Sequence, residues 1–215
     1  MGNLKTISVP KKPNKELIEL LGAHWGDGCL QNEIKRNNYV WRIFGNLNKD
    51  ENYLDYLSKK IFLLFSIKPK KHFTYKKNMV YLEIYSKSLL LYLKNNLNIT
   101  VGKKRFLEVN KEYIENSGYR VDFIRGLFDT DWCVVIDKRK KKPYGVIKIC
   151  NSDYSLITYI VNNLKSLGFN PRLWKGNKWD DYQISICGRE EISRWIKVIG
   201  SNNPRNKDKL NTLIQ

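Results

Sequence analysis

The sequence predicts an α+β protein made of two similar halves, because three features recur along it. Each half has an apolar segment with helical spacing, two pairs of alternating, strand-like segments and a further helical pattern. Three residues near the first helical segment also return in step, 104 positions later (131 − 27, for example): Gly22 with Gly126, Asp27 with Asp131, and Cys29 with Cys133. A repeat of this length constrains the architecture more strongly than any single motif does.

The elements follow the same order in both halves. An apolar pattern with spacing i, i+1, i+4, i+8 and i+11 starts at Tyr53 and again at Leu156, which predicts a helix between the strand pairs. The other expected elements are helices over 16–27 and 121–131, strands over 80–85 and 182–187, and helices over 87–97 and 189–199. We therefore expect two pseudo-symmetric αββαββα halves, residues 1–112 and 113–215, whose antiparallel sheets each leave one polar face open.

The charge of the chain indicates an acidic polymer as its partner. Among 215 residues there are 39 Lys and Arg against 21 Asp and Glu, a formal net charge of +18. With 42% hydrophobic residues the chain is too apolar for a disordered basic tail. No segment is long and apolar enough to span a membrane or to act as a signal peptide, so we expect an intracellular protein, cytoplasmic in a prokaryote or organellar, and not secreted.

Cysteine and histidine do not predict a metal site of their own. The four cysteines form no C-x-x-C pair, so we expect free thiols and no zinc. His24 lies in an apolar helix and should face the core. His72 begins the basic stretch before a strand, and we expect it in a loop or on the face that binds the acidic polymer. Neither is expected to act as a general acid or base.

The two repeated aspartates are the strongest candidates for chemistry. Glycine inside a helix costs roughly 1 kcal/mol relative to alanine, so Gly22 and Gly126 indicate that two helices approach each other closely. Such packing would bring Asp27 and Asp131, the last residues of the two helices, side by side. Adjacent carboxylates need a cation between them, and Mg²⁺ takes one or two carboxylates with phosphate and water oxygens.

These residues resemble the two motifs of the single-chain LAGLIDADG homing endonucleases, with one copy at 20–28 and the other at 124–132. The resemblance covers nearly the whole chain. It implies a saddle of two antiparallel sheets astride double-stranded DNA, and a monomer that cuts both strands of a long, pseudo-palindromic target. It also implies that Asp27 and Asp131 are catalytic metal ligands sharing two or three Mg²⁺ ions, and that the gene lies in an intron or an intein-like element.

The chain departs from the family pattern at two tryptophans. Trp25 replaces the first acid of the first motif, so Asp129 has no acidic counterpart and is expected to be a solvated or hydrogen-bonded acid at a helix end. Trp132 replaces the final glycine of the second motif, where a bulky ring could displace Asp131 and reduce cleavage of one strand.

The resemblance also implies polar residues that order catalytic water. Asn48 and Asn151 are the nearest candidates after the strands. Lys103, with Lys104 as its alternative, and Lys207 are the candidates near the ends of the halves, and ordinary phosphate contacts are an equally good interpretation of all of them.

Basic and aromatic residues cluster where the open sheet faces should be, which predicts DNA contacts. Alternation places some of them outward, where Arg or Lys could read guanine and Gln could read adenine. The candidate DNA-binding residues are Gln31, Glu33, Lys35, Arg36, Arg42, Lys70, Lys71, Tyr75, Lys76, Lys77, Glu83, Tyr85, Lys138, Arg139, Lys140, Lys148, Arg172, Trp174, Lys175, Lys178, Gln183 and Ser185.

Two other functions remain open at this point. The same scaffold could bind without cutting, as an intron RNA maturase or a DNA-binding regulator. The presence of both Asp27 and Asp131 favours the enzyme, and Trp132 keeps the alternative open. A basic RNA-binding domain unrelated to the family would not explain the paired motif offsets.

Overall fold

The computed structural model describes residues 7–33, 38–104, 112–115, 118–137, 144–176 and 181–213. Its elements in the first half are α1 (Lys15–Asp27), β1 (Gly28–Glu33), β2 (Asn38–Asn46), α2 (Leu47–Phe65), β3 (Lys70–Thr74), the 3-10 turn η2 (Tyr75–Lys77), β4 (Met79–Tyr85) and α3 (Lys87–Leu97). Those in the second half are α4 (Glu112–Glu115), α5 (Tyr119–Asp131), β5 (Cys133–Asp137), β6 (Tyr144–Asn151), α6 (Tyr154–Ser166), β7 (Arg172–Lys175), β8 (Tyr182–Cys187), α7 (Arg189–Val198) and α8 (Pro204–Thr212). The predicted α+β architecture is confirmed, and η2, α4 and α8 are additional elements.

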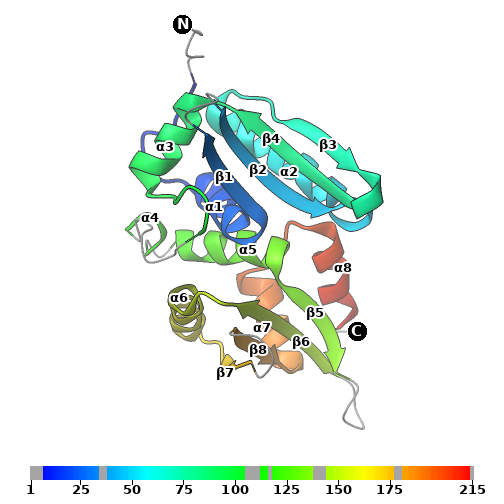
Figure 1. The fold of residues 1–215 in the computed structure, drawn as a ribbon. Helices are drawn as coiled ribbons and strands as arrows, with labels where there is room; N and C mark the ends of the chain where they lie inside the picture. Colours follow the sequence, from blue (N-terminus) through cyan, green and yellow to red (C-terminus); the bar gives the residue numbers. More distant parts are fainter. Residues whose placement is uncertain are drawn as a thin grey trace, which may run out of the picture.

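Each half contains one antiparallel sheet of four strands with the same topology. The strand orders are β1-β2-β4-β3 and β5-β6-β8-β7. Helices cover one face of each sheet, and the opposite faces are open (Figure 1). Alternation explains this arrangement, because Leu30, Trp41 and Ile84 form one buried row across the first sheet, and Val134, Ile147 and Ile186 form the matching row in the second.

Several helices begin at side chains that satisfy their free backbone N–H groups. Asn14 accepts a hydrogen bond from the Leu17 backbone at the start of α1, and Ser86 does the same for Leu89 at the start of α3. Asp153 accepts from two backbone N–H groups at the start of α6. Helices α2, α3, α6 and α7 bury apolar residues against their own sheets, whereas α1 and α5 pack mainly against each other.

Helices α1 and α5 cross in the middle of the molecule, between the two sheets (Figure 1). A Cβ atom placed on Gly22 would collide with the Phe123 carbonyl oxygen and lie 2.9 Å from the Leu127 nitrogen. A Cβ atom on Gly126 would collide with the Glu19 carbonyl in the same way. The two backbones therefore touch directly, and this is the close approach that the repeated glycines predict.

A buried polar network connects the halves beside this crossing. The Glu19 carboxylate, only 2% exposed, accepts hydrogen bonds from the Tyr56 hydroxyl at 2.9 Å, from Lys60 Nζ at 2.6 Å and from the Asn202 side chain at 2.8 Å. Asn203 donates to both Asp50 Oδ1 and the Asp129 backbone carbonyl, each at 2.9 Å. These contacts attach the segment before α8 to both halves.

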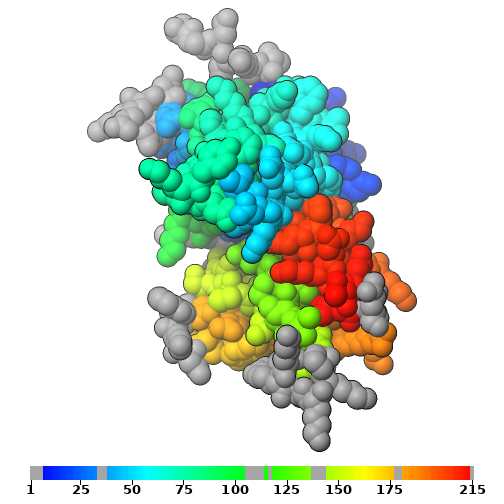
Figure 2. Space-filling view, turned by 90° about the vertical axis from the view of Figure 1, so that its right-hand side faces the viewer, coloured from blue at the N-terminus to red at the C-terminus, as the bar shows by residue number. Residues whose placement is uncertain are grey.

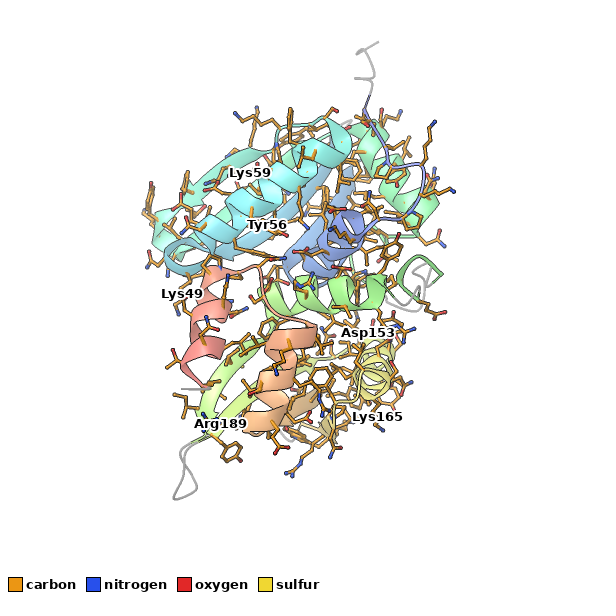
Figure 3. All side chains as sticks on the ribbon, turned by 180° about the vertical axis from the view of Figure 1, so that it is seen from behind. Lys49, Tyr56, Lys59, Asp153, Lys165 and Arg189 are labelled. Atoms are coloured by element: carbon orange, nitrogen blue, oxygen red, sulfur yellow. The ribbon has the colours of Figure 1, made fainter. Side chains whose placement is uncertain are left out.

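The figures show how this C-terminal segment lies. In Figure 2 the orange-red to red end of the chain lies directly below the cyan part of the first half and beside the green part of the second half. In Figure 3 the end of α2 that carries Lys49 lies against α8. No described helix is long and apolar enough to cross a lipid bilayer.

The helix crossing gives a direct test of the packing. Alanine normally stabilises a helix relative to glycine, but Gly22→Ala should lower the free energy of unfolding by at least about 2 kcal/mol, because its methyl group meets backbone atoms that cannot move away. Urea unfolding measures this, with Asn96→Ala on the exposed side of α3 as the control. A Gly22→Ala protein as stable as the wild type would contradict the observed crossing.

Candidate metal centre and nucleic-acid face

The α1–α5 crossing brings Asp27 and Asp131 together at the ends of their helices. A Cβ atom on Gly26 would lie 3.2 Å from Asp131 Cβ, so the last turns of α1 and α5 adjoin. Asp27 is half-buried and Asp131 reaches the surface. Both carboxylates lie at helix C-termini, where the helix dipole is negative, so the four partial or full negative charges repel one another.

The pKa values reflect this crowding. Burial, followed by the charge of Asp131, raises the pKa of Asp27 to about 6, against the opposing effect of Lys104. Burial also raises the pKa of Asp131, while Lys104 and a hydrogen bond from the Asn151 side chain lower it. The positive charge around Asp27 and Asp131 therefore does not fully neutralise the two carboxylates, and a bound cation would stabilise their charged forms.

Lys104 supplies part of that charge. Its Nζ donates to the backbone carbonyls of His24, Trp25 and Gly26 at 3.3, 2.9 and 2.5 Å, and so caps the last turn of α1. Burial lowers the pKa of Lys104, and the nearby Asp131 and Asp27 carboxylates act against that shift. Sequence alone could not separate Lys104 from Lys103, whose side chain is exposed.

The equivalent place in the second half holds an amide. The Asn206 side chain donates to the Phe128 carbonyl at 3.2 Å, and Phe128 corresponds to His24 in the repeat. Lys207, the residue singled out from the sequence, is exposed on α8. The two carboxylates thus share one half-buried lysine, Lys104, among the described residues.

The asparagines also differ between the halves. Asn151, at the end of β6, lies against Asp131 as the sequence suggests. Asn48 is exposed at the start of α2, where its backbone N–H donates to the Asn46 side chain. By strand register, Gly45 takes the place of Asn151 in the first half, so no side chain there can contact Asp27.

Trp132 does not displace Asp131. Its ring is buried at 3% exposure and packs on Phe128 and Trp195, with ring centroids 5.9 and 5.6 Å away. In the first half the corresponding residue is Gly28, the first residue of β1, and the indole comes instead from β2, where Trp41 donates to His24 Nδ1 at 3.1 Å. The two halves fill the same space from different elements.

Two other acid–base residues of the motif helices are buried. His24 is confirmed as a core residue, and burial lowers its pKa to about 3, so it stays neutral. Asp129 is hydrogen-bonded, as expected, but it is fully buried and not solvated. It accepts hydrogen bonds from the Ser201 hydroxyl and from the Asn202 backbone at 2.7 Å, and burial raises its pKa to about 7.

The Asp27–Asp131 pair fits a divalent cation by its donor chemistry. Both carboxylates offer hard oxygen donors, the ligands that Mg²⁺ prefers, and they lie in a region of negative electrostatic potential. No cluster of three or more His, Cys, Asp or Glu side chains suited to a metal occurs among the described residues. An ion bound here would need its remaining oxygens from water or from phosphate.

The open faces carry most of the residues that alternation placed outward. One row across the first sheet contains Cys29, Arg42, Glu83 and Lys70, and the matching row in the second contains Cys133, Lys148, Ser185 and Arg172. Strand register puts the following further candidates on the same faces: Gln31, Tyr85, Gln183, Trp174 and His72. Tyr75, Lys76 and Lys77 are exposed in η2.

Two of the candidate DNA-binding lysines lie on the other side of their sheets. Lys71 faces α2, where it forms ion pairs with Asp55 and with Glu51 at 3.5 Å, so its assignment to the open face is corrected. Lys175 shares the helix-covered side with Tyr182. The following candidates lie outside the described residues or have side chains outside them: Glu33, Lys35, Arg36, Lys138, Arg139, Lys140 and Lys178.

The family comparison finds a match in the second half. Residues 118–200 match the model of the LAGLIDADG-like domain. The chain is also 34% identical over 89 residues to the replicative DNA helicase DnaB of Rhodothermus marinus. That match covers 40% of this chain but 9% of the helicase, so it concerns a segment of that protein.

Solved structures match the chain over nearly its whole length. Variants of the homing endonuclease I-DmoI superpose with a TM-score of 0.61 at 19% identity, covering 92% of this chain and 97% of theirs. I-DmoI in complex with DNA and Mn gives 0.58 at 22% identity, covering 87% and 98%. The LAGLIDADG meganuclease I-AabMI bound to uncleaved DNA gives 0.62 at 12% identity, covering 94% and 90%.

These matches define the fold. The chain has the two-domain fold of the LAGLIDADG homing endonucleases, with both motif helices in one polypeptide. The resemblance that the sequence shows to the single-chain, two-motif form of this family is thereby confirmed.

The raised pKa of Asp27 predicts how stability depends on pH without divalent cations. The folded state holds this proton up to a pH of about 6, whereas the unfolded chain releases it near 3.8. The contribution of Asp27 to stability therefore falls as pH rises through that window. Asp27→Asn removes this loss. At pH 8 its free energy of unfolding should exceed that of the wild type by about 1 kcal/mol, and at pH 4 this difference should be smaller.

Urea unfolding in EDTA at both pH values measures the difference. An Asn96→Ala protein, changed at an exposed position of α3, serves as the control. An Asp27→Asn effect that is equal at pH 4 and pH 8 would contradict the assigned electrostatic cost.

Proposed function

We propose that this protein is a site-specific, metal-dependent DNA endonuclease that cuts both strands of a long pseudo-palindromic target. The observation that carries the proposal is the meeting of Asp27 and Asp131 at two helix ends, between two open sheet faces. The structural relatives support it, because they are homing endonucleases described in complexes with DNA and Mn, Ca or Mg.

DNA binding follows from the charge and from the sheets. A net charge of +18 favours a polyanion, and the open faces present Arg42, Lys70, Lys148 and Arg172 in matching rows. A two-stranded β-ribbon, such as the antiparallel strand pairs of each sheet, fits the major groove. Since the two faces carry different side chains in register, the two halves of the target should differ in sequence.

The chemistry expected is hydrolysis of phosphodiester bonds. A divalent cation, when bound, lowers the pKa of a water molecule and stabilises the leaving oxygen. Asp27 and Asp131 would hold it and define its place relative to the DNA. Lys104 would bring a fixed positive charge to the same point, and Asn151 would orient the Asp131 carboxylate.

We further propose that the gene belongs to an intron or an intein-like element. Similarity to a segment covering 9% of a much longer helicase supports this, because it indicates that related sequence occurs inside a larger polypeptide.

Asp27→Asn and Asp131→Asn test the nuclease directly. Each should abolish Mg²⁺-dependent double-strand cleavage of a plasmid carrying the uninterrupted host locus, while binding to the same DNA persists within about threefold, because the amides keep the shape but lose the charge. Gel analysis of cleavage and fluorescence anisotropy measure the two effects. Uncut plasmid with wild-type protein, together with tight binding of the intron RNA, would favour an RNA maturase instead.

Replacing Lys104 tests the second part of the site. Lys104→Met should lower the single-turnover cleavage rate by about 10², since it removes the half-buried cation beside both carboxylates. Lys103→Met, one residue away with an exposed side chain, should cut within about threefold of wild type. The reverse order of the two effects would show that Lys103 is the functional residue.

A further inference from the structure

We propose that Arg42 reads a guanine in the half of the DNA target that lies against the first sheet, and that Glu83 and Gln31 position it for this task. The inference rests on the proposed DNA endonuclease function and adds a base-specific contact to it. It starts from one hydrogen-bonded group on the open face, Arg42 on β2 with its neighbours on β1 and β4.

The guanidinium of Arg42 is held from two sides. Its Nε donates to Glu83 Oε2 at 2.6 Å, and its NH1 group donates to Gln31 Oε1 at 2.6 Å. Glu83 is itself fixed, because it is 6% exposed and His72 Nε2 lies 3.2 Å from its other oxygen. An arginine held in this way loses little conformational freedom when it binds a ligand.

The remaining donors match a guanine. A guanidinium has five N–H groups. The contacts to Glu83 and Gln31 use two of them and the Tyr85 side chain accepts from a third, so two N–H groups of Arg42 remain free. Two parallel donors of that kind fit the O6 and N7 acceptors that guanine presents in the major groove.

The setting favours a base over a phosphate. Glu83 neutralises the charge of Arg42, which weakens its attraction for the DNA backbone but leaves its donor geometry intact. Arg42 also lies on an inner strand and is 21% exposed in its side chain, whereas Lys70 ends the same row on the edge strand β3. Phosphates suit the unneutralised lysine at the edge, and base edges suit the held arginine.

The described part of the second half has no arginine held by a carboxylate at the matching position of its open face. Lys148 takes the place of Arg42 in the matching row, and its cross-strand neighbours are Cys133 and Ser185, neither of which is acidic. Guanine readout of this kind should therefore be confined to one half-site. Because Cys29, opposite Arg42, follows Asp27 by two residues, or about 7 Å of strand, the guanine should lie within about four base pairs of the cleavage centre.

Selection of cleaved DNA from a library randomised across the target tests the proposal. Wild-type protein should select guanine at one position of one half-site by about tenfold to a hundredfold over the other bases. Arg42→Gln should lose that preference and keep the preferences elsewhere. Glu83→Gln should weaken it by at least about threefold, because the arginine remains but is no longer fixed.

Matched variants separate the possible outcomes. Arg42→Gln/Glu83→Gln removes the charge pair together, so its loss of guanine preference with unchanged thermal unfolding would exclude misfolding as the cause. Lys148→Gln should change the other half-site only. Unchanged guanine preference in Arg42→Gln would overturn the inference while the nuclease stands, whereas a library that wild-type protein never cuts would overturn the proposed function itself.

Discussion

The direct contact between the backbones of α1 and α5 is the constraint on which the rest of the structure depends. Gly22 and Gly126 lack the atom that would hold the helices apart, so the helices cross at backbone distance. Because both helices end five residues further on, the crossing also decides where Asp27 and Asp131 meet. The sheets, attached directly after those aspartates, take their positions from the same crossing.

The two halves share a topology but differ in how they support the site. Lys104 caps the end of α1 in the first half, and Asn206 makes the corresponding contact in the second. Asn151 contacts Asp131, while Gly45 leaves Asp27 without such a partner. A single chain permits this asymmetry, because each half evolves its own side chains around a shared centre.

The polar network around Glu19 favours one arrangement of the two halves relative to each other, because its contacts are not symmetric. Glu19 corresponds to Phe123 in the repeat, so its partners Tyr56, Lys60 and Asn202 have no symmetric set on the other side. A buried carboxylate without those donors would cost several kcal/mol. The segment before α8 therefore acts as a connection specific to this pairing, and Figure 2 shows it in that place.

The sequence correctly predicted which face of a sheet most strand side chains occupy, because that follows from strand periodicity. Alternation placed Arg42, Glu83, Lys148 and Ser185 on the open faces, because strand side chains alternate strictly. It failed for Lys71, because a run of three basic residues hides which side each one faces. It could not choose Lys104 over Lys103 either, since that segment has no regular period.

Contacts between residues far apart in the chain could not be predicted from the sequence either. The Glu19–Asn202 hydrogen bond joins residues on opposite sides of the repeat, and the burial of Asp129 depends on the fold of residues 201–203. Trp132 looked disruptive only because Trp195, which packs against it, lies far along the chain.

The most direct test of the central claim is the position of Mn²⁺ in crystals of the protein with its cut-site DNA, located by anomalous diffraction. The account predicts anomalous peaks about 2.2 Å from carboxylate oxygens of both Asp27 and Asp131. Peaks that contact neither carboxylate, with the DNA in place, would contradict it.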